Sequence, residues 1–232
     1  CHVEPTHKKQ FLNEFATLRL GDSDHIYTNV LDRQVRKAVS KAQRNKLLVE
    51  ERHDVESIRD WFYPLYLRYM KERHGAPPLP LDLFIGFAER MASYLKVFYV
   101  KHDKRIIAAL LGYAVGKRIY ISHAPVILEF NSLRPVDLAH WKFIEWGCKQ
   151  GFEYFDFGNA KYAGQKQFKK KWGCEFTEYN RIYYLRDDNC SLPKSLNPIG
   201  YKYQLASQLW RFLVPTSWSP VLGQRIHALL GE

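Results

Sequence analysis

The sequence gives little support to cysteine or metal chemistry. Its four cysteines are widely spaced and form no Cys-x-x-Cys pair, and its nine histidines are scattered. This distribution argues against a disulfide scaffold and against a zinc site, and it favours a reducing cytosol. We therefore expect no metal ion and no permanently bound cofactor.

Long apolar runs are also absent. No stretch of the sequence reaches the ~18–20 apolar residues that a membrane-spanning helix needs. The sequence therefore predicts a cytoplasmic protein whose only membrane contact is peripheral, at the inner face.

Acidic residues are few in comparison with basic ones. The chain has 35 Lys and Arg against 24 Asp and Glu, which gives a formal net charge of +11. Such a balance fits a polyanionic partner, for example tRNA, a nucleotide-linked or lipid-linked phosphate, CoA or an anionic membrane surface. A generic solvated basic surface fits the composition equally well.

The hydrophobic periodicity predicts an α/β protein. Short turns separate the expected strands 96–101, 106–115 and 118–123, which is typical of an antiparallel meander. A helix over 132–150 and a strand over 153–157 follow. Further strands are expected over 10–20, 46–51 and 175–186, and further helices over 26–45, 54–74, 81–93 and 164–172. This order is that of a mixed, largely antiparallel sheet flanked by helices.

Residues 154–173 are the most informative part of the sequence. A short apolar run ends around Asp156 and Gly158, and a cationic segment then leads to a Trp-Gly pair. The pattern predicts a strand end, a loop whose backbone at Gly158 and Asn159 can approach a ligand, and one short basic helix. We expect it at the carboxyl edge of a sheet, where α/β proteins usually bind ligands.

The same stretch resembles the signature of Fem-type transferases. The matching residues are Asp156-Phe157-Gly158, Lys161, Gly164, Phe168-Lys169 and Trp172-Gly173. More closely, the chain is similar to the FemAB-like branch associated with exopolysaccharide and cell-envelope loci, over about residues 8–186. The resemblance implies a GNAT (N-acetyltransferase-like) fold. It also implies transfer of an acyl or aminoacyl group to an amine acceptor in peptidoglycan or exopolysaccharide biosynthesis.

The resemblance also implies a domain organisation. Residues 28–186 would form the GNAT-like transferase domain, and 187–232 a linker with C-terminal amphipathic helices. Fem-type proteins generally pair two GNAT-like domains, so residues 1–27 are interpreted as the remnant of a preceding segment or domain. The C-terminal helices, with Trp210 and Trp218, suit either a membrane interface or docking on the domain's own core.

Three residues are candidates for catalysis. In Fem-type enzymes the lysine of the Phe-Lys pair is implicated at the reacting centre or at a bound phosphate, and Lys169 occupies that position. Asp156 is a candidate acceptor of the amine proton, or a cap for backbone N–H groups of the following helix. His123, at the end of the third meander strand, is a candidate general base or a structural histidine.

Other residues are candidates for binding phosphate. Lys161 and Lys170 lie in the basic segment, although Lys170 can equally stabilise a helix end through the helix dipole. Arg134 precedes Pro135 at an expected helix start, and Arg36 lies on the basic face of helix 26–45.

The absence of a glycine-rich loop limits the choice of acyl donor. Acetyl-CoA-dependent GNAT proteins bind the pyrophosphate with a glycine-rich loop, whereas residues 129–136 contain no glycine. Fem-type proteins share this feature, which favours aminoacyl-tRNA or an unusual acyl-CoA as the donor and an envelope or polysaccharide precursor as the acceptor. The alternative is a non-catalytic module that binds tRNA or a membrane surface through its basic face.

Overall fold

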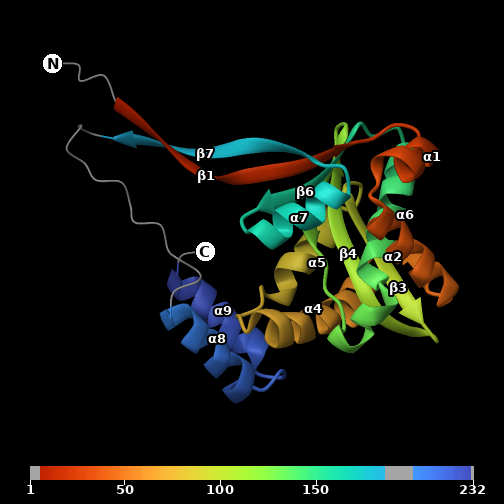
Figure 1. The fold of residues 1–232 in the computed structure, drawn as a ribbon. Coiled ribbons are helices and arrows are strands. Elements are labelled where there is room, and N and C mark those ends of the chain that lie inside the picture. Colours follow the sequence, from red (N-terminus) through yellow and green to blue (C-terminus); the bar gives the residue numbers. More distant parts are fainter. Residues whose placement is uncertain (1–5, 186–200, 231–232) are drawn as a thin grey trace.

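The computed structural model describes residues 6–185 and 201–230, whose fold is shown in Figure 1. Seven strands form one sheet in the order β2-β3-β4-β5-β6-β1-β7. Neighbouring strands are antiparallel, except that β5 and β6 are parallel. The strands are β1 (Thr6–Arg19), β2 (Leu48–Glu51), β3 (Leu95–His102), β4 (Arg105–Val115), β5 (Arg118–His123), β6 (Tyr154–Ala160) and β7 (Glu175–Leu185). The predicted mixed, largely antiparallel sheet is confirmed.

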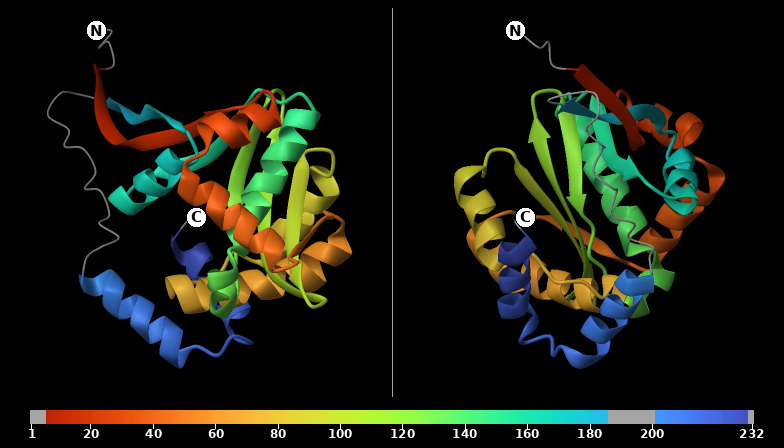
Figure 2. Two further views of the ribbon diagram at one scale, coloured as in Figure 1. Left: turned by 45° about the vertical axis from the view of Figure 1, so that its right-hand side comes forward. Right: turned by 90° about the vertical axis from the view of Figure 1, so that its left-hand side faces the viewer.

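Helices cover both faces of the sheet (Figure 2). One face carries α2 (Arg33–Arg44) and α6 (Pro135–Lys149), and the other carries α4 (Tyr63–Tyr69) and α5 (Leu81–Arg90). The remaining helices and turns are α1 (Ser23–His25), η1 (Ile26–Val30), α3 (Val55–Ser57), η2 (Ile58–Phe62), η3 (Met70–His74), η4 (Leu128–Leu133), α7 (Ala163–Lys171), α8 (Tyr201–Leu213) and α9 (Ser219–Leu230). None of the helices within the described ranges is long and apolar enough to cross a membrane.

Alternation along β3 divides the core into two layers. Phe98 and Val100 pack with α2 and α6, whereas Val97 and Tyr99 pack with α4 and α5. Successive side chains of a strand point to opposite faces, so both faces of the central strands are buried.

Residues 26–45 do not form the single helix that their periodicity predicts. Leu31 is extended, with φ −69° and ψ 134°, and it ends the π-helical turn η1. Asp32 then caps α2, because its Oδ1 accepts a hydrogen bond of 2.7 Å from the backbone N–H of Gln34.

Strand β1 lies inside the sheet, between β6 and β7. Residues 6–19, which the sequence assigns to a preceding segment, therefore belong to the same sheet as the expected transferase domain. Of the predicted C-terminal region, α8 and α9 are present, whereas 186–200 lie outside the described residues.

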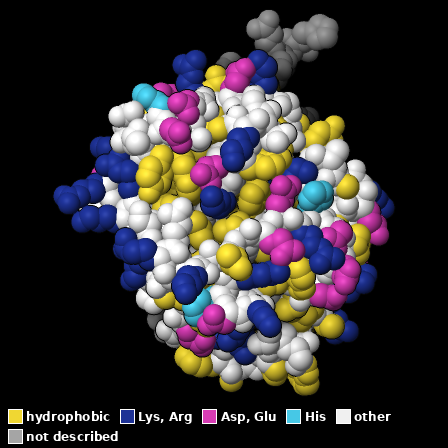
Figure 3. All heavy atoms as spheres, turned by 90° about the vertical axis from the view of Figure 1, so that its right-hand side faces the viewer, with side chains coloured by type: hydrophobic (Ala, Val, Ile, Leu, Met, Phe, Trp, Pro, Cys, Tyr) yellow, Lys and Arg dark blue, Asp and Glu magenta, His cyan; other side chains and the backbone are white. Residues whose placement is uncertain are grey.

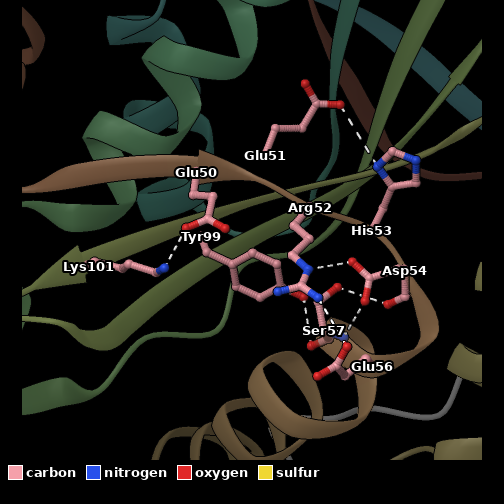
Figure 4. Close-up of polar contacts among 9 residues, drawn as sticks. All are labelled: Glu50, Glu51, Arg52, His53, Asp54, Glu56, Ser57, Tyr99 and Lys101. Atoms are coloured by element: carbon pink, nitrogen blue, oxygen red, sulfur yellow. Dashed lines mark hydrogen bonds and ion pairs between the residues drawn. The ribbon is translucent and has the colours of Figure 1, made fainter.

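Polar side chains fix the turn between β2 and α3 (Figure 4). Asp54 accepts hydrogen bonds from the backbone N–H of Ser57, at 2.9 Å, and from Nε of Arg52, at 2.6 Å. The Tyr99 hydroxyl donates to the carbonyl oxygen of Ser57 at 3.0 Å. Because Tyr99 belongs to β3, this bond ties the first turn of α3 to the sheet.

The parallel strands β5 and β6 separate towards their carboxyl ends. They pair only where residues 118–120 face 154–156. Beyond β5 the chain follows β4 instead: the N–H of Ala109 donates to the carbonyl of Pro125 at 3.0 Å, and the N–H of Ile127 donates to that of Ile107 at 2.9 Å. The sheet is therefore split between β5 and β6.

Gly112 in β4 provides a test of this packing. A Cβ atom there would lie 2.8 Å from the carbonyl oxygen of Tyr120 and 2.9 Å from the ring of Phe143. We expect Gly112→Ala to lower the free energy of unfolding in urea by about 1–3 kcal/mol. Gly86→Ala, in α5 with nothing within 4 Å of the added atom, is the control and should raise stability slightly. Equal effects of the two substitutions would contradict the packing described.

Candidate active site

A cleft of about 730 Å³ lies where β5 and β6 separate. Its walls include the end of β5, the end of β6, α7, the start of α6, and Tyr69 and Arg73 of the α4–η3 segment. The right-hand view of Figure 2 faces this side of the molecule, with the β1–β7 ribbon above and α8 and α9 below. The volume is in the range of small-molecule and cofactor sites.

Every charged side chain among the described residues that line the cleft is a cation. These side chains are Arg73, Arg134 and Lys169, and no Asp or Glu lines this cleft. Cations that share a concave surface reinforce one another's field, so the cleft favours an anionic ligand.

Lys169 is anchored in the cleft wall by the backbone of β6. Its side chain is 7% exposed, and Nζ donates to the carbonyl oxygens of Gly158 at 2.9 Å and Asn159 at 2.5 Å. Carbonyls of successive residues in a regular strand point in opposite directions, but Gly158 has φ +72°, which lets both face one ammonium. Burial lowers the pKa of Lys169, although the Cys174 thiol and the Asp156 carboxylate oppose this effect.

The loop expected at Gly158 and Asn159 is not present, because β6 continues to Ala160 and pairs there with β1. Asp156 supports this part of β6 and does not line the cleft. Its Oδ1 accepts a hydrogen bond of 2.7 Å from the N–H of Gly158, and its Oδ2 lies 3.5 Å from Nη1 of Arg118. This geometry fits a structural role for Asp156, although the N–H that it accepts from belongs to Gly158 of β6 and not to the following helix α7, as the sequence suggested.

His123 is not brought together with Asp156 and Lys169. Its ring packs among Phe62, Tyr66 and Phe84, at centroid distances of 6.3, 5.3 and 5.3 Å. The register of β4 against β5 shifts by one residue between Leu111 and Gly112, which turns His123 towards the α4–α5 layer. The predicted general base is therefore absent from the cleft. Burial lowers the pKa of His123 to about 4.

Arg134 lines the cleft and directly precedes α6, the helix start at which the sequence places it. It precedes α6 with φ +65°, its side chain is exposed, and its Nη1 lies 4.0 Å from the Asp137 carboxylate. The N-terminal N–H groups of α6 lie beside it, so a phosphate could meet a guanidinium and a helix N-terminus together. Asn159 also lines the cleft, and its buried Oδ1 has no hydrogen-bond partner among the described residues.

The other predicted phosphate contacts lie elsewhere. Nη1 of Arg36 donates to the carbonyls of Thr28 at 2.8 Å and Leu31 at 2.6 Å, so this guanidinium closes the end of η1 and does not face the cleft. Lys161 and Lys170 are exposed beside and on α7, outside the residues that line the cleft.

Comparison of the sequence with known protein families identifies the family of this chain. Residues 29–170 match the family model of the acetyltransferase (GNAT) domain. The chain belongs to this family. No curated protein sequence matches this GNAT chain.

Solved structures share the GNAT fold with this chain. FemX is 15% identical with a TM-score of 0.65, and the match covers 75% of this chain and 63% of FemX. L-PGS from Bacillus licheniformis is 15% identical with a TM-score of 0.59, and the match covers 88% of this chain and 66% of L-PGS. The chain thus spans less than two thirds of either protein. The predicted resemblance to Fem-type GNAT proteins is confirmed at the level of the fold.

Two residues that line the cleft of this GNAT domain, His140 and Arg73, are not recognisable as site residues from the sequence. His140 is 5% exposed, its Nδ1–H donates to the carbonyl of Val136 at 2.8 Å, and its ring stacks on Phe157 with centroids 5.2 Å apart. Burial, reinforced by the charge of Lys169, lowers the pKa of His140 to about 4. The histidine is therefore neutral at pH 7, with an unshared electron pair on Nε2. Its only sequence signal is a polar residue within an apolar stretch of the helix after Arg134.

The environment of His123 predicts acid sensitivity of the fold. Between pH 6.5 and about 4 the unfolded chain binds a proton at this residue and the folded chain does not, so the free energy of unfolding falls as the pH decreases. Phenylalanine can replace the imidazole ring among the surrounding aromatic side chains but cannot bind a proton. We therefore expect His123→Phe to make the acid-induced decrease in the free energy of unfolding smaller by up to about 3 kcal/mol. Urea unfolding at several pH values measures it. His25→Gln, at an exposed position, is the control; if both variants keep the wild-type pH dependence, His123 is not buried in the neutral form.

Proposed function

We propose that this GNAT domain transfers an acyl or aminoacyl group from a phosphate-bearing donor to an amine acceptor. The observation that carries the proposal is the cleft between β5 and β6, where Arg73, Arg134 and Lys169 converge without an acidic residue among the described lining. Such a lining suits a donor whose phosphates carry negative charge, and Lys169 lies in the wall at the strand end.

The donor is either an ester of tRNA or a thioester of CoA. The guanidinium of Arg134 and the adjoining N-terminus of α6 provide a place for one of its phosphates. The glycine-free stretch 129–136 supports a donor other than a conventional acetyl-CoA. The amine acceptor is proposed to be a peptidoglycan, exopolysaccharide or other envelope precursor, on the basis of the Fem-type signature in residues 154–173.

The residues of the cleft suggest how the reaction proceeds. The amine nitrogen attacks the carbonyl carbon of the donor, and negative charge develops on the carbonyl oxygen. Lys169 already donates to two backbone carbonyls, and its remaining N–H can donate to this oxygen. Nε2 of His140 can accept the amine proton. The C–O or C–S bond then breaks, and the leaving oxygen or sulfur takes the proton held by Nε2 of His140, which restores the neutral histidine.

Helix α2 offers support for the second candidate, a module that only binds polyanions. α2 contains no Asp or Glu. Its exposed cations recur along one side of the helix and are Arg33, Lys37, Lys41 and Arg44. Across most of the face shown in Figure 3, however, Lys and Arg side chains are interspersed with Asp and Glu. A purely electrostatic surface also gives no role to the buried Lys169 and His140, so we favour the enzyme.

Replacement of Lys169 tests the proposed chemistry. Lys169→Met keeps the length of the side chain but removes its charge and its N–H donors. We expect transfer from a pool of charged tRNA or of acyl-CoA to an envelope-precursor extract to fall at least about 100-fold. Lys170→Met, the exposed neighbour, should retain the wild-type rate. Circular dichroism and thermal unfolding establish that both variants are folded, and a folded Lys169→Met protein with full activity would sink the proposal.

His140 is tested separately. His140→Phe retains an aromatic ring against Phe157 and removes Nε2. If Nε2 accepts the amine proton, kcat should fall by about 100-fold or more while KM changes little. If the ring only fills space, kcat will be unchanged and any effect will appear in the unfolding temperature.

A further inference from the structure

The C-terminal hairpin formed by α8 and α9 is attached to the rest of the protein through one side of α8 and through Gly223 of α9, where an added Cβ would lie 2.6 Å from the carbonyl oxygen of Pro78. Trp210 is 8% exposed, Ser207 Oγ donates to the carbonyl of His74 at 2.8 Å, and Arg211 Nη2 donates to that of Arg73 at 3.4 Å. Figures 1 and 2 show α8 and α9 projecting beside the end of α4. These contacts cover one side of α8, which we call its docked stripe.

A second apolar stripe of α8 is left uncovered. Leu205, Leu209 and Phe212 recur with helical spacing, and at about 100° per residue they lie opposite the docked stripe. Exposed apolar residues continue past the end of α8 into α9. We call the whole set the hairpin surface; its residues are 43–78% exposed and comprise Leu205, Leu209, Phe212, Leu213, Trp218 and Val221. Large apolar side chains left exposed in this number are typical of an interaction site.

The charge of this region indicates what covers it. Residues 201–230 contain no Asp or Glu, and Arg225 of α9 is exposed. The same region of a second copy would bring no acidic side chain against this cation. An anionic bilayer would neutralise it, and Trp and Phe side chains are favoured at the boundary between headgroups and acyl chains.

We propose that the hairpin surface docks on an anionic phospholipid bilayer. The docked stripe of α8 contacts η3, and Arg73 of η3 also lines the cleft. Binding through the hairpin would therefore hold the cleft close to the lipid headgroups. The docking does not depend on the proposed transferase reaction and can be measured without a donor.

Flotation with vesicles tests the proposal on the whole chain. We expect the protein to float with vesicles of phosphatidylcholine and phosphatidylglycerol and to remain behind with pure phosphatidylcholine. Phe212→Ser combined with Trp218→Ser should weaken binding to the anionic vesicles at least about tenfold, because it removes two apolar side chains that enter the interface.

A matched double variant on the β1–β7 ribbon provides the control. Phe11 and Tyr184 are 58% and 76% exposed, and Phe11→Ser combined with Tyr184→Ser should leave vesicle binding unchanged. The proposal is overturned if the wild-type protein does not float, if the hairpin variant floats as the wild type does, or if both variants lose binding equally. Sedimentation velocity gives an independent check: a dimer that the hairpin substitutions dissociate would assign the surface to a second copy and also overturn the proposal.

Discussion

The separation of β5 from β6 is the constraint on which the cleft depends. A strand that leaves its neighbour exposes carbonyl groups, and a buried carbonyl without a donor destabilises the fold. At the end of β6 the ammonium of Lys169 supplies donors to the carbonyls of Gly158 and Asn159. One side chain therefore completes the hydrogen bonding of the split strand and brings a positive charge to the cleft. The same hydrogen bonds of Lys169 therefore stabilise the fold and position a cation in the site.

Hydrogen bonds hold both the N–H and the carbonyl of Gly158, near the end of β6. The Asp156 carboxylate accepts from its N–H while Lys169 donates to its carbonyl, and Arg118 lies beside the carboxylate. A strand end fixed by groups of both signs needs little rearrangement when charge develops nearby, which is the condition for effective electrostatic stabilisation. The exposed cations Arg33, Lys37, Lys41 and Arg44 of α2 are not fixed in this way, so the cleft and not the basic helix is the better candidate for chemistry.

The sequence predicts the parts of the site that lie close together in the chain. The strand and Lys169 fall within one short signature, and Arg134 is recognisable from the proline that follows it. The loop expected at Gly158 is wrong, because pairing with β1 carries β6 on to Ala160. His123 could not be placed, because a one-residue bulge between β4 and β5 decides which face it occupies and leaves no local pattern. Arg36 depends on the carbonyls left open where η1 stops. His140 becomes notable only when α6 is seen against β6.

The position of β1 affects the order in which the domain can be completed. Strands β2 to β5 join their neighbours in chain order, so each can pair soon after it leaves the ribosome. β1 precedes them all, yet its partners β6 and β7 are the last strands of the sheet to be synthesised. Pairing so remote in sequence is slow and leaves the early strand unprotected in the meantime. A nascent chain released before β6 would contain most of the core but no cleft.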